Sequence, residues 1–232
     1  MTYSSKSLNG LVIQFTRLYL GHLDLPLTEI GLQQAEIVAK HIVSHRRIKT
    51  IFSSDLQRAA QTGAWVHKLI PTAPLVLDSR LREKCMGKFE GKPWGSIQKA
   101  AAKENIEYAA YVPKGGETYH EFEERILAGL NAIIERVVDT TDEVIVTAHG
   151  GVIFHLFGYY QNKPNSGKGG ALIATNTLPE NVSLSTLSVH RGSSNEMEIR
   201  IVDYNNTKHL DNLDPSLKTT VRGFSGHATD TI

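Results

Sequence analysis

Cysteine is almost absent from the sequence, which has only Cys85 among its 232 residues. A single thiol excludes an internal disulfide framework and any zinc site built from several cysteines. The residues after Cys85 are Met-Gly-Lys-Phe-Glu-Gly, so the nearby arginine that a cysteine phosphatase needs is missing too. The composition agrees with a reducing compartment, and we expect a cytoplasmic protein, with the nucleus as a second compartment.

An excess of charge of one sign is also lacking, because 25 Lys and Arg residues face 24 Asp and Glu residues. No basic block is interleaved with aromatic residues, so we expect no nucleic acid among the partners. Long apolar runs are lacking as well, and the N-terminal stretch MTYSSKSLNG does not have the charged and apolar regions of a secretory signal. We therefore expect no membrane partner, whereas a small anionic ligand is compatible with this balance.

Strand and helix signals alternate along the chain, which predicts an α/β fold. Apolar runs indicate strands at Leu11–Phe15, Ile48–Phe52, Leu75–Leu77, Glu143–Ala148, Ser183–His190 and Glu196–Tyr204. Helical spacing indicates helices at Thr28–Ser44, Leu56–Leu69, Trp94–Glu107, Tyr119–Val138 and Val152–Tyr160. Thr28 should cap the first helix, and Ser53, Ser54 or Asp55 should cap the second.

We predict a three-layer sandwich in which helices flank a mostly parallel central sheet. The strand Glu143–Ala148 has the clearest buried pattern. The last two strands, separated by Arg-Gly-Ser-Ser-Asn, should form a C-terminal antiparallel hairpin that closes the sheet. The segment Gln161–Thr175 should be a loop. One domain is expected over residues 1–210, followed by a polar tail at residues 211–232.

A histidine followed by two glycines stands at the end of the buried strand. In parallel sheets, ligands bind where strands lead into helices. Gly150 and Gly151 permit close backbone approach, and the unpaired N–H groups of a helix start favour an anion such as phosphate. His149 could then donate a hydrogen bond to the phosphate or exchange a proton. An isolated histidine is more often a core residue bonded to a carbonyl, but this setting favours the functional interpretation.

Two further polar segments are candidates for the same site. Arg58 lies in the first turn of a helix, where a cation opposes the helix dipole, so its position favours an anionic ligand. The alternative is a surface ion pair with Asp55. Glu83 follows two arginines in a polar loop. Repulsion from a phosphate dianion can keep such a carboxyl protonated at neutral pH, ready to protonate a leaving alkoxide, and an ordinary ion pair is the alternative.

Five motifs occur in one order along the chain: GHLDLPLTEIGLQQA, SSDLQRAAQT, LREKCMGKFEG, PKGGET and VTAHGG. From Leu18 to Tyr159 the chain thereby resembles the phosphoglycerate-mutase-like branch of the histidine phosphatase superfamily. The resemblance implies phosphomonoester hydrolysis through a transiently phosphorylated histidine, with no cofactor or metal and with phosphate or a small phosphorylated substrate as ligand. The stretch MGKFEG is more similar to phosphatases, including fructose-2,6-bisphosphatase-like and broad-specificity fungal members, than to mutases.

The resemblance also implies roles for single residues. The catalytic candidates are His149, as the second and phosphate-binding histidine, and Glu83, as the proton donor. The candidates for phosphate binding are Arg58, Arg17, Gly21 and Gly150. Glu117 in PKGGET is expected to order its loop or to lie near the substrate rather than to react. A homodimer is compatible with the sequence.

The reactive signature of the family, Arg-His-Gly at the end of the first strand, is missing. It should lie about a dozen and a half residues before Asp24, near Leu8, where the chain reads Lys-Ser-Leu-Asn-Gly. In one alignment Leu11–Arg17 is the first strand, Arg17 stands at the signature arginine and the reactive loop is deleted. In the other, residues 1–17 are unrelated sequence. Both remove the nucleophile, and His22, the first histidine, stands at a position that varies in the family.

Several interpretations of function are left open. The first is a phosphatase-family protein that retains the phosphate clamp but has impaired activity. The second is a catalytically inactive protein that binds phosphate or a partner, and a phosphoglycerate mutase-type isomerase lineage is a further alternative. The missing motif can be a true loss or the product of a splice or gene-model variant of an active enzyme.

Overall fold

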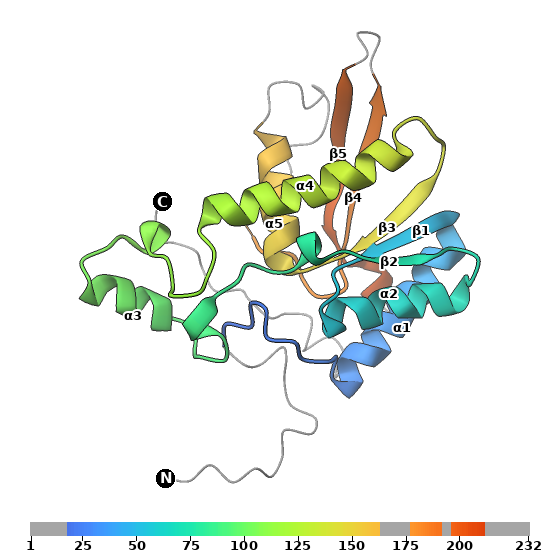
Figure 1. The fold of residues 1–232 in the computed structure, drawn as a ribbon. Coiled ribbons are helices and arrows are strands. Elements are labelled where there is room, and N and C mark those ends of the chain that lie inside the picture. The colour runs from blue at the N-terminus through green and yellow to red at the C-terminus, as the bar shows by residue number, and fades with distance from the viewer. Residues whose placement is uncertain (1–17, 163–176, 192–195, 212–232) are drawn as a thin grey trace.

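Alternating strands and helices fold into three layers in the computed structural model (Figure 1). The part of the chain that the structure describes comprises residues 18–162, 177–191 and 196–211. The central strands are β1 (Ile48–Ser53), β2 (Leu75–Leu77) and β3 (Glu143–Thr147). They form a parallel sheet in the order β2-β1-β3. The three strands predicted for this sheet are therefore confirmed to within one residue at their ends.

The middle strand of this sheet is β1, and its Ile51 is aligned with Leu75 of β2 and Ile145 of β3. Ile51 is completely buried, whereas all five residues of β3 are only half-buried. The clear buried pattern of Glu143–Ala148 overstates the burial of this strand. Among the described strands β3 pairs only with β1, so it forms an edge of the described sheet, and an edge strand exposes more of its side chains.

Helices cover both faces of the sheet (Figure 1). They are α1 (Glu29–His45), α2 (Gln57–Leu69), α4 (Tyr119–Val137) and α5 (Gly150–Gln161). Successive strand residues point to opposite faces, so Ile51 and Ile145 pack with α1 and α2 while Phe52 packs with Ile133 of α4. Burial of apolar side chains on both faces of the sheet stabilises the fold, by about 25 cal/mol for each Å² of apolar surface removed from water. The predicted three-layer α/β class is confirmed.

The C-terminal strands β4 (Leu184–Arg191) and β5 (Met197–Asn206) form an antiparallel hairpin. Ile199 and Tyr204 are buried in one cluster with apolar residues of α4 and α5. The predicted hairpin is confirmed, but its strands pair with none of the described strands of the central sheet, so the expectation that it closes the sheet stays a prediction. Within the described residues the hairpin is a separate two-stranded sheet, so packed side chains, and not strand pairing, attach it to the rest.

Two threonine caps begin helices at the predicted places. Thr28 Oγ1 accepts a hydrogen bond from Gly31 N at 3.0 Å at the start of α1. Thr118 and Glu121 form a reciprocal capping box at the start of α4, with Thr118 N donating to Glu121 Oε2 at 2.8 Å. These local bonds satisfy N–H groups that the first helical turn leaves unpaired. The Thr28 cap was predicted, whereas the Thr118 capping box was not.

The start of α2 is capped from a distant part of the chain. Its N-cap residue is Leu56, whose side chain makes no capping bond, and Ser54 Oγ accepts from Leu56 N at 3.3 Å. Gln57 N donates instead to Asp24 Oδ1 at 2.7 Å. The helix cap expected from residues 53–55 is therefore supplied mainly by Asp24, which ties the first loop to α2.

The helix α3 (Ser96–Lys103) is shorter than the predicted Trp94–Glu107. Gly95 precedes it in the left-handed region with φ of +83°, a conformation that glycine adopts without strain. The chain then leaves the helix and forms a 3₁₀ turn, η3 (Tyr108–Ala110). The helical spacing of apolar residues predicted one continuous helix, but the backbone leaves the helical conformation after Lys103.

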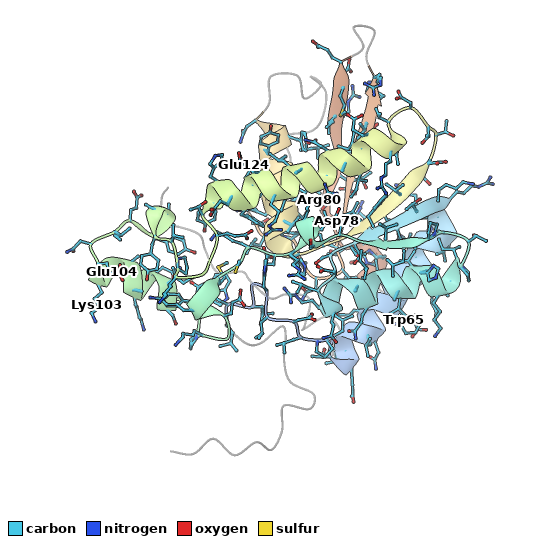
Figure 2. All side chains as sticks on the ribbon, viewed as in Figure 1. Trp65, Asp78, Arg80, Lys103, Glu104 and Glu124 are labelled. Atoms are coloured by element: carbon cyan, nitrogen blue, oxygen red, sulfur yellow. The ribbon has the colours of Figure 1, made fainter. Side chains whose placement is uncertain are left out.

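Short 3₁₀ turns complete the described chain, and they are η1 (Ser79–Leu81), η2 (Gly87–Phe89) and η4 (Lys208–Leu210). Figure 2 labels Asp78 and Arg80 at η1, close to α4. Arg80 Nη2 donates to Asp78 Oδ2 at 2.6 Å. In η4, Leu210 is buried and the His209 ring lies 5.0 Å from that of His41 on α1, so η4 docks on α1.

Several expectations fall outside the described residues. They concern the strand Leu11–Phe15, residues 163–175 of the predicted loop, and residues 212–232 of the predicted tail. The domain boundary expected at residue 210 stays a prediction. Among the described helices, none combines the length and the apolar character needed to cross a bilayer.

The cap on α2 can be tested by substitution. Asp24→Ala should lower the free energy of unfolding by about 0.5–1 kcal/mol, because Gln57 N loses its acceptor at an exposed position where water replaces part of the bond. Urea denaturation measures the change. Asp142→Ala, which removes another exposed carboxylate, is the control, and equal effects of the two substitutions would contradict the capping role.

Candidate active site

Hydroxyl groups join the carboxyl ends of β1 and β3. Thr147 Oγ1 donates to Ser53 Oγ at 2.7 Å, and Ser54 N donates to Thr147 O at 2.9 Å. Ser53 and Ser54 are completely buried. These bonds bring the loops after the two strands side by side at the sheet edge where α/β proteins bind ligands.

His149 stands between β3 and α5 as the N-cap residue of the helix. Its side chain is 7% exposed, and Nε2 lies 2.8 Å from Ser54 Oγ. Burial is the main cause that lowers the pKa of His149 well below its usual 6.5, and the positive charges of Arg58 and His22 lower it further. The ring is therefore neutral at pH 7, with one nitrogen as donor and the other as acceptor.

The carboxylate of Glu83 lies against the first turn of α5. Gly151 N donates to Glu83 Oε2, and Lys84 N donates to Glu83 Oε1, each at 2.9 Å. A Cβ atom at position 151 would stand 2.3 Å from Glu83 Oε1, so only glycine permits this approach. The carboxylate thus occupies a helix start whose unpaired N–H groups and dipole favour negative charge.

Arg58 reaches from the first turn of α2 to the first loop. Its Nη1 donates to Leu23 O at 2.8 Å, and its Nη2 donates to Gly21 O at 2.9 Å. Burial lowers the pKa of Arg58, but a guanidinium remains charged at neutral pH. Because these two bonds are its only hydrogen bonds within the described residues, the guanidinium keeps N–H donors for an anionic ligand.

Asp55 does not form the ion pair with Arg58 that was the alternative explanation for that arginine. It is bound by Arg82, with 2.7 Å from Nε to Oδ1 and 2.5 Å from Nη2 to Oδ2. Hydrogen bonding from Arg82 lowers the pKa of Asp55 below its usual value. A bidentate pair of this kind also fixes the loop that leads to Glu83.

Gly21 and His22 connect the first loop to the Glu83 loop. Gly21 has φ of +50°, and a Cβ atom there would lie 2.5 Å from Glu90 Oε1. The same carboxylate oxygen accepts from His22 N at 2.8 Å, while His22 Nε2 lies 2.8 Å from Glu83 O. The glycine of the GHLD motif is therefore required where two loops touch.

Glu117 holds the neighbouring loop. Its carboxylate oxygens accept from Arg125 Nε at 2.6 Å and Arg125 Nη2 at 2.8 Å, and Oε2 also accepts from Cys85 N at 2.8 Å. This agrees with the expectation that Glu117 orders its loop. No sequence pattern pointed to Arg125, because no periodicity links a loop residue to a guanidinium about two turns into the next helix.

Four predicted site residues lie around the start of α5, and they are His149, Gly150, Glu83 and Arg58. A fifth, Gly21, is connected to them by the hydrogen bond that Arg58 donates to its carbonyl oxygen. The sixth, Arg17, lies outside the described residues. Sequence reasoning missed Ser54 and His22, whose contacts depend on loops that meet only in the folded chain. Among residues 18–162, 177–191 and 196–211 no three His, Cys, Asp or Glu side chains are grouped as a metal ion needs.

Known proteins resemble this chain in sequence and in fold. A family model described as the histidine phosphatase superfamily (branch 1) matches residues 14–201. Fructose-2,6-bisphosphatase TIGAR of Xenopus tropicalis is 37% identical over 106 residues, which cover 44% of this chain and 38% of that protein. Metal-independent phosphoserine phosphatase of Arabidopsis thaliana is 28% identical over 156 residues, 64% of this chain and 63% of that one. The chain thus matches less than two thirds of the length of either relative.

A solved structure has the same arrangement of elements. It is a mycobacterial glucosyl-3-phosphoglycerate phosphatase in complex with inorganic phosphate, with a TM-score of 0.66 and 25% sequence identity. The similarity covers 84% of this chain and 94% of that one. The three-layer fold described above is therefore an arrangement on which a phosphate-binding enzyme has been solved.

Burial of His149 should make stability depend on pH. The folded pKa is depressed below about 6.5, so the unfolded chain binds a proton that the folded chain excludes as the pH falls. The stability from the neutral ring is fully present above pH 6.5 and is lost below it, at up to about 1.4 kcal/mol per pH unit. His149→Gln should therefore lose less stability than the wild type between about pH 7.5 and pH 5.5.

Urea denaturation at the two pH values measures this difference. His120→Gln, an exposed histidine on α4, is the control and should follow the wild type. An unchanged pH dependence in His149→Gln would show that the ring is not held in its neutral form.

Proposed function

The chain belongs to the histidine phosphatase superfamily, branch 1, and we propose that its site binds a small phosphate ester whose hydrolysis by this chain is impaired. The observation that carries the proposal is the arrangement at the start of α5. There the neutral His149, the charged Arg58 and the carboxyl of Glu83 surround the helix start. His149 and Arg58 could bind an anion there, and the carboxyl of Glu83 would lie beside it as the acid.

Three kinds of donor would hold the phosphoryl oxygens. The start of α5 at Gly150 offers backbone N–H groups and the positive end of a helix dipole. Arg58 offers charge-assisted hydrogen bonds from the donors that the first loop does not use. His149, neutral at pH 7, offers one N–H from its ring. These groups can neutralise and orient a phosphate ester.

Glu83 is the proposed proton donor to the leaving group. As the bond from phosphorus to the ester oxygen breaks, the protonated carboxyl would transfer its proton to that oxygen and become a carboxylate. Gly151 N lies 2.9 Å from Glu83 Oε2, so the carboxylate formed has a hydrogen-bond donor in place. The leaving group would then depart as a neutral alcohol.

The nucleophile is the part of the family mechanism that this sequence does not supply. The 232 residues contain no Arg-His-Gly tripeptide. The two histidines described at the site have their Nε2 atoms against other groups, with His22 at Glu83 O and His149 at Ser54 Oγ. We therefore propose that the phosphohistidine route is closed and that only slower, direct attack of water on phosphorus remains.

A second candidate function uses the same site without turnover. In that case the chain is a pseudoenzyme that binds phosphate or a phosphorylated partner. The contacts of His22 and His149 favour this function as much as they favour slow hydrolysis. The two relatives described above have phosphatase names, and we propose the hydrolase lineage. For the substrate we propose a phosphomonoester.

The clamp can be tested with sulfate, an anion that does not titrate near neutral pH. Arg58→Ala and His149→Ala should each weaken sulfate binding about tenfold or more, since a hydrogen bond to a charged group contributes about 1.5–3 kcal/mol. Isothermal titration calorimetry measures the affinity. Arg47→Ala removes an equal charge at an exposed position and should leave the affinity unchanged. Wild-type affinity in both site variants would show that the clamp is assigned to the wrong residues.

The loss of the nucleophile predicts a second result. The purified chain should give negligible turnover of an aryl phosphate and no acid-labile phosphohistidine. A matched variant with His-Gly-Glu-Thr inserted between Arg17 and Leu18 should become labelled. Robust phosphohistidine labelling of the chain without the insertion would contradict the proposal of impaired activity. Failure to label an insertion variant that still binds sulfate would show that the missing motif is not the cause.

A further inference from the structure

Arg125, on α4, has its guanidinium group enclosed by hydrogen-bond acceptors. Its Nε and Nη2 bind the two oxygens of Glu117 at 2.6 and 2.8 Å, and the two side chains are only 20% and 19% exposed. The guanidinium carbon also lies 5.3 Å from the centroid of the Phe122 ring. A half-buried bidentate pair of this kind has a fixed geometry.

The other bonds of Arg125 converge on the backbone that leads to Glu83. Nη1 donates to the carbonyl oxygens of Arg80 and Arg82, each at 2.9 Å. Nη2 also donates to the carbonyl oxygen of Glu83 at 3.1 Å. One side chain therefore binds three carbonyls within four residues, and the last of them belongs to the proposed acid itself.

Glu117 holds the backbone on the other side of Glu83. Its carboxylate accepts from Cys85 N at 2.8 Å, and its own backbone N donates to Cys85 O at 3.0 Å. Lys84 Nζ donates to Glu117 O. The chain before Glu83 is thus fixed by Arg125, and the chain after it is fixed by Glu117.

We propose that Arg125, paired with Glu117, is a positioning residue that places the carboxyl of Glu83 on the first turn of α5. The inference rests on the proposed function, because the role of Glu83 as acid comes from there. The carboxyl is separated from the fixed backbone by only the short side chain of Glu83, and it meets Gly151 N at 2.9 Å. A shift of the backbone would move it off the helix start.

Only the shape of an arginine side chain allows this arrangement of hydrogen bonds. The guanidinium presents five N–H donors in a rigid plane, whereas a lysine ammonium is a compact charge with three donors. Lysine at position 125 would keep the charge but could not bind the Glu117 carboxylate and three carbonyls together. Arg125 also adds to the positive field that lowers the pKa of His149, so it acts on both proposed catalytic groups without touching a substrate.

The amide of Gly151 provides a direct readout, because its proton is bonded to Glu83 Oε2. Glu83→Ala removes the acceptor and should change the amide chemical shift in a ¹H–¹⁵N spectrum of the protein without ligand, which sets the reference for a lost hydrogen bond at Gly151 N. Arg125→Lys should move the Gly151 signal most of the way to that reference. Glu117→Gln should move it in the same direction. Arg136→Lys, an exposed arginine on the same helix, is the matched control and should leave it in place.

A merely structural role would lower the melting temperature of Arg125→Lys and leave the Gly151 signal unmoved, and that result would overturn the proposal. If Arg125→Lys does not fold, Glu117→Gln provides the test. An unmoved Gly151 signal in Glu117→Gln would also overturn the proposal. The spectrum needs no ligand or turnover, so the sulfate titration tests the proposed function separately. A moved Gly151 signal in a protein that does not bind sulfate would refute the function and retain the positioning role.

Discussion

The buried hydrogen bond between His149 Nε2 and Ser54 Oγ joins the loops that leave two neighbouring parallel strands. Both residues are buried, and a buried polar group left without a partner costs about 1–3 kcal/mol. The bond therefore fixes the imidazole at the start of α5 and the turn that precedes α2. Since α2 carries Arg58 and α5 carries the helix start, the geometry of the whole site depends on this junction.

Segments far apart in the sequence are brought to that junction by backbone and side-chain contacts. The first loop is tied to α2 through Asp24 and to the Glu83 loop through His22. The Glu83 loop is held from the other side by Arg125 and Glu117. A carboxyl and a predicted anion site thus share one helix start, which is the arrangement that proton transfer to a phosphate ester requires.

Local signals in the sequence predicted much of this structure. The start of α1 followed from the Thr28 cap, and the start of α4 followed from the helical pattern that begins at Tyr119, because both signals act within one or two turns. Arg58 and His149 became candidates because parallel strands place the residues after them at one sheet edge, whereas Gly21 rested on the family resemblance.

Features that depend on distant partners could not be predicted. Asp24 caps α2 from 33 residues away, and Arg125 meets Glu117 through the fold of a loop. The half-buried state of β3 depends on which strands pair with it and not on its own residues.

The proposed function depends on an anion site at the start of α5 next to a neutral histidine. Titration of isotope-labelled protein with sulfate, followed at the amides of Gly150 and Gly151 and at the His149 ring, tests it most directly. We expect saturable shifts of both amides and a rise in the pH at which His149 titrates, because a bound anion stabilises the imidazolium. Sulfate shifts confined to exposed cationic side chains, with the two amides and the ring unmoved, would contradict the proposed anion site.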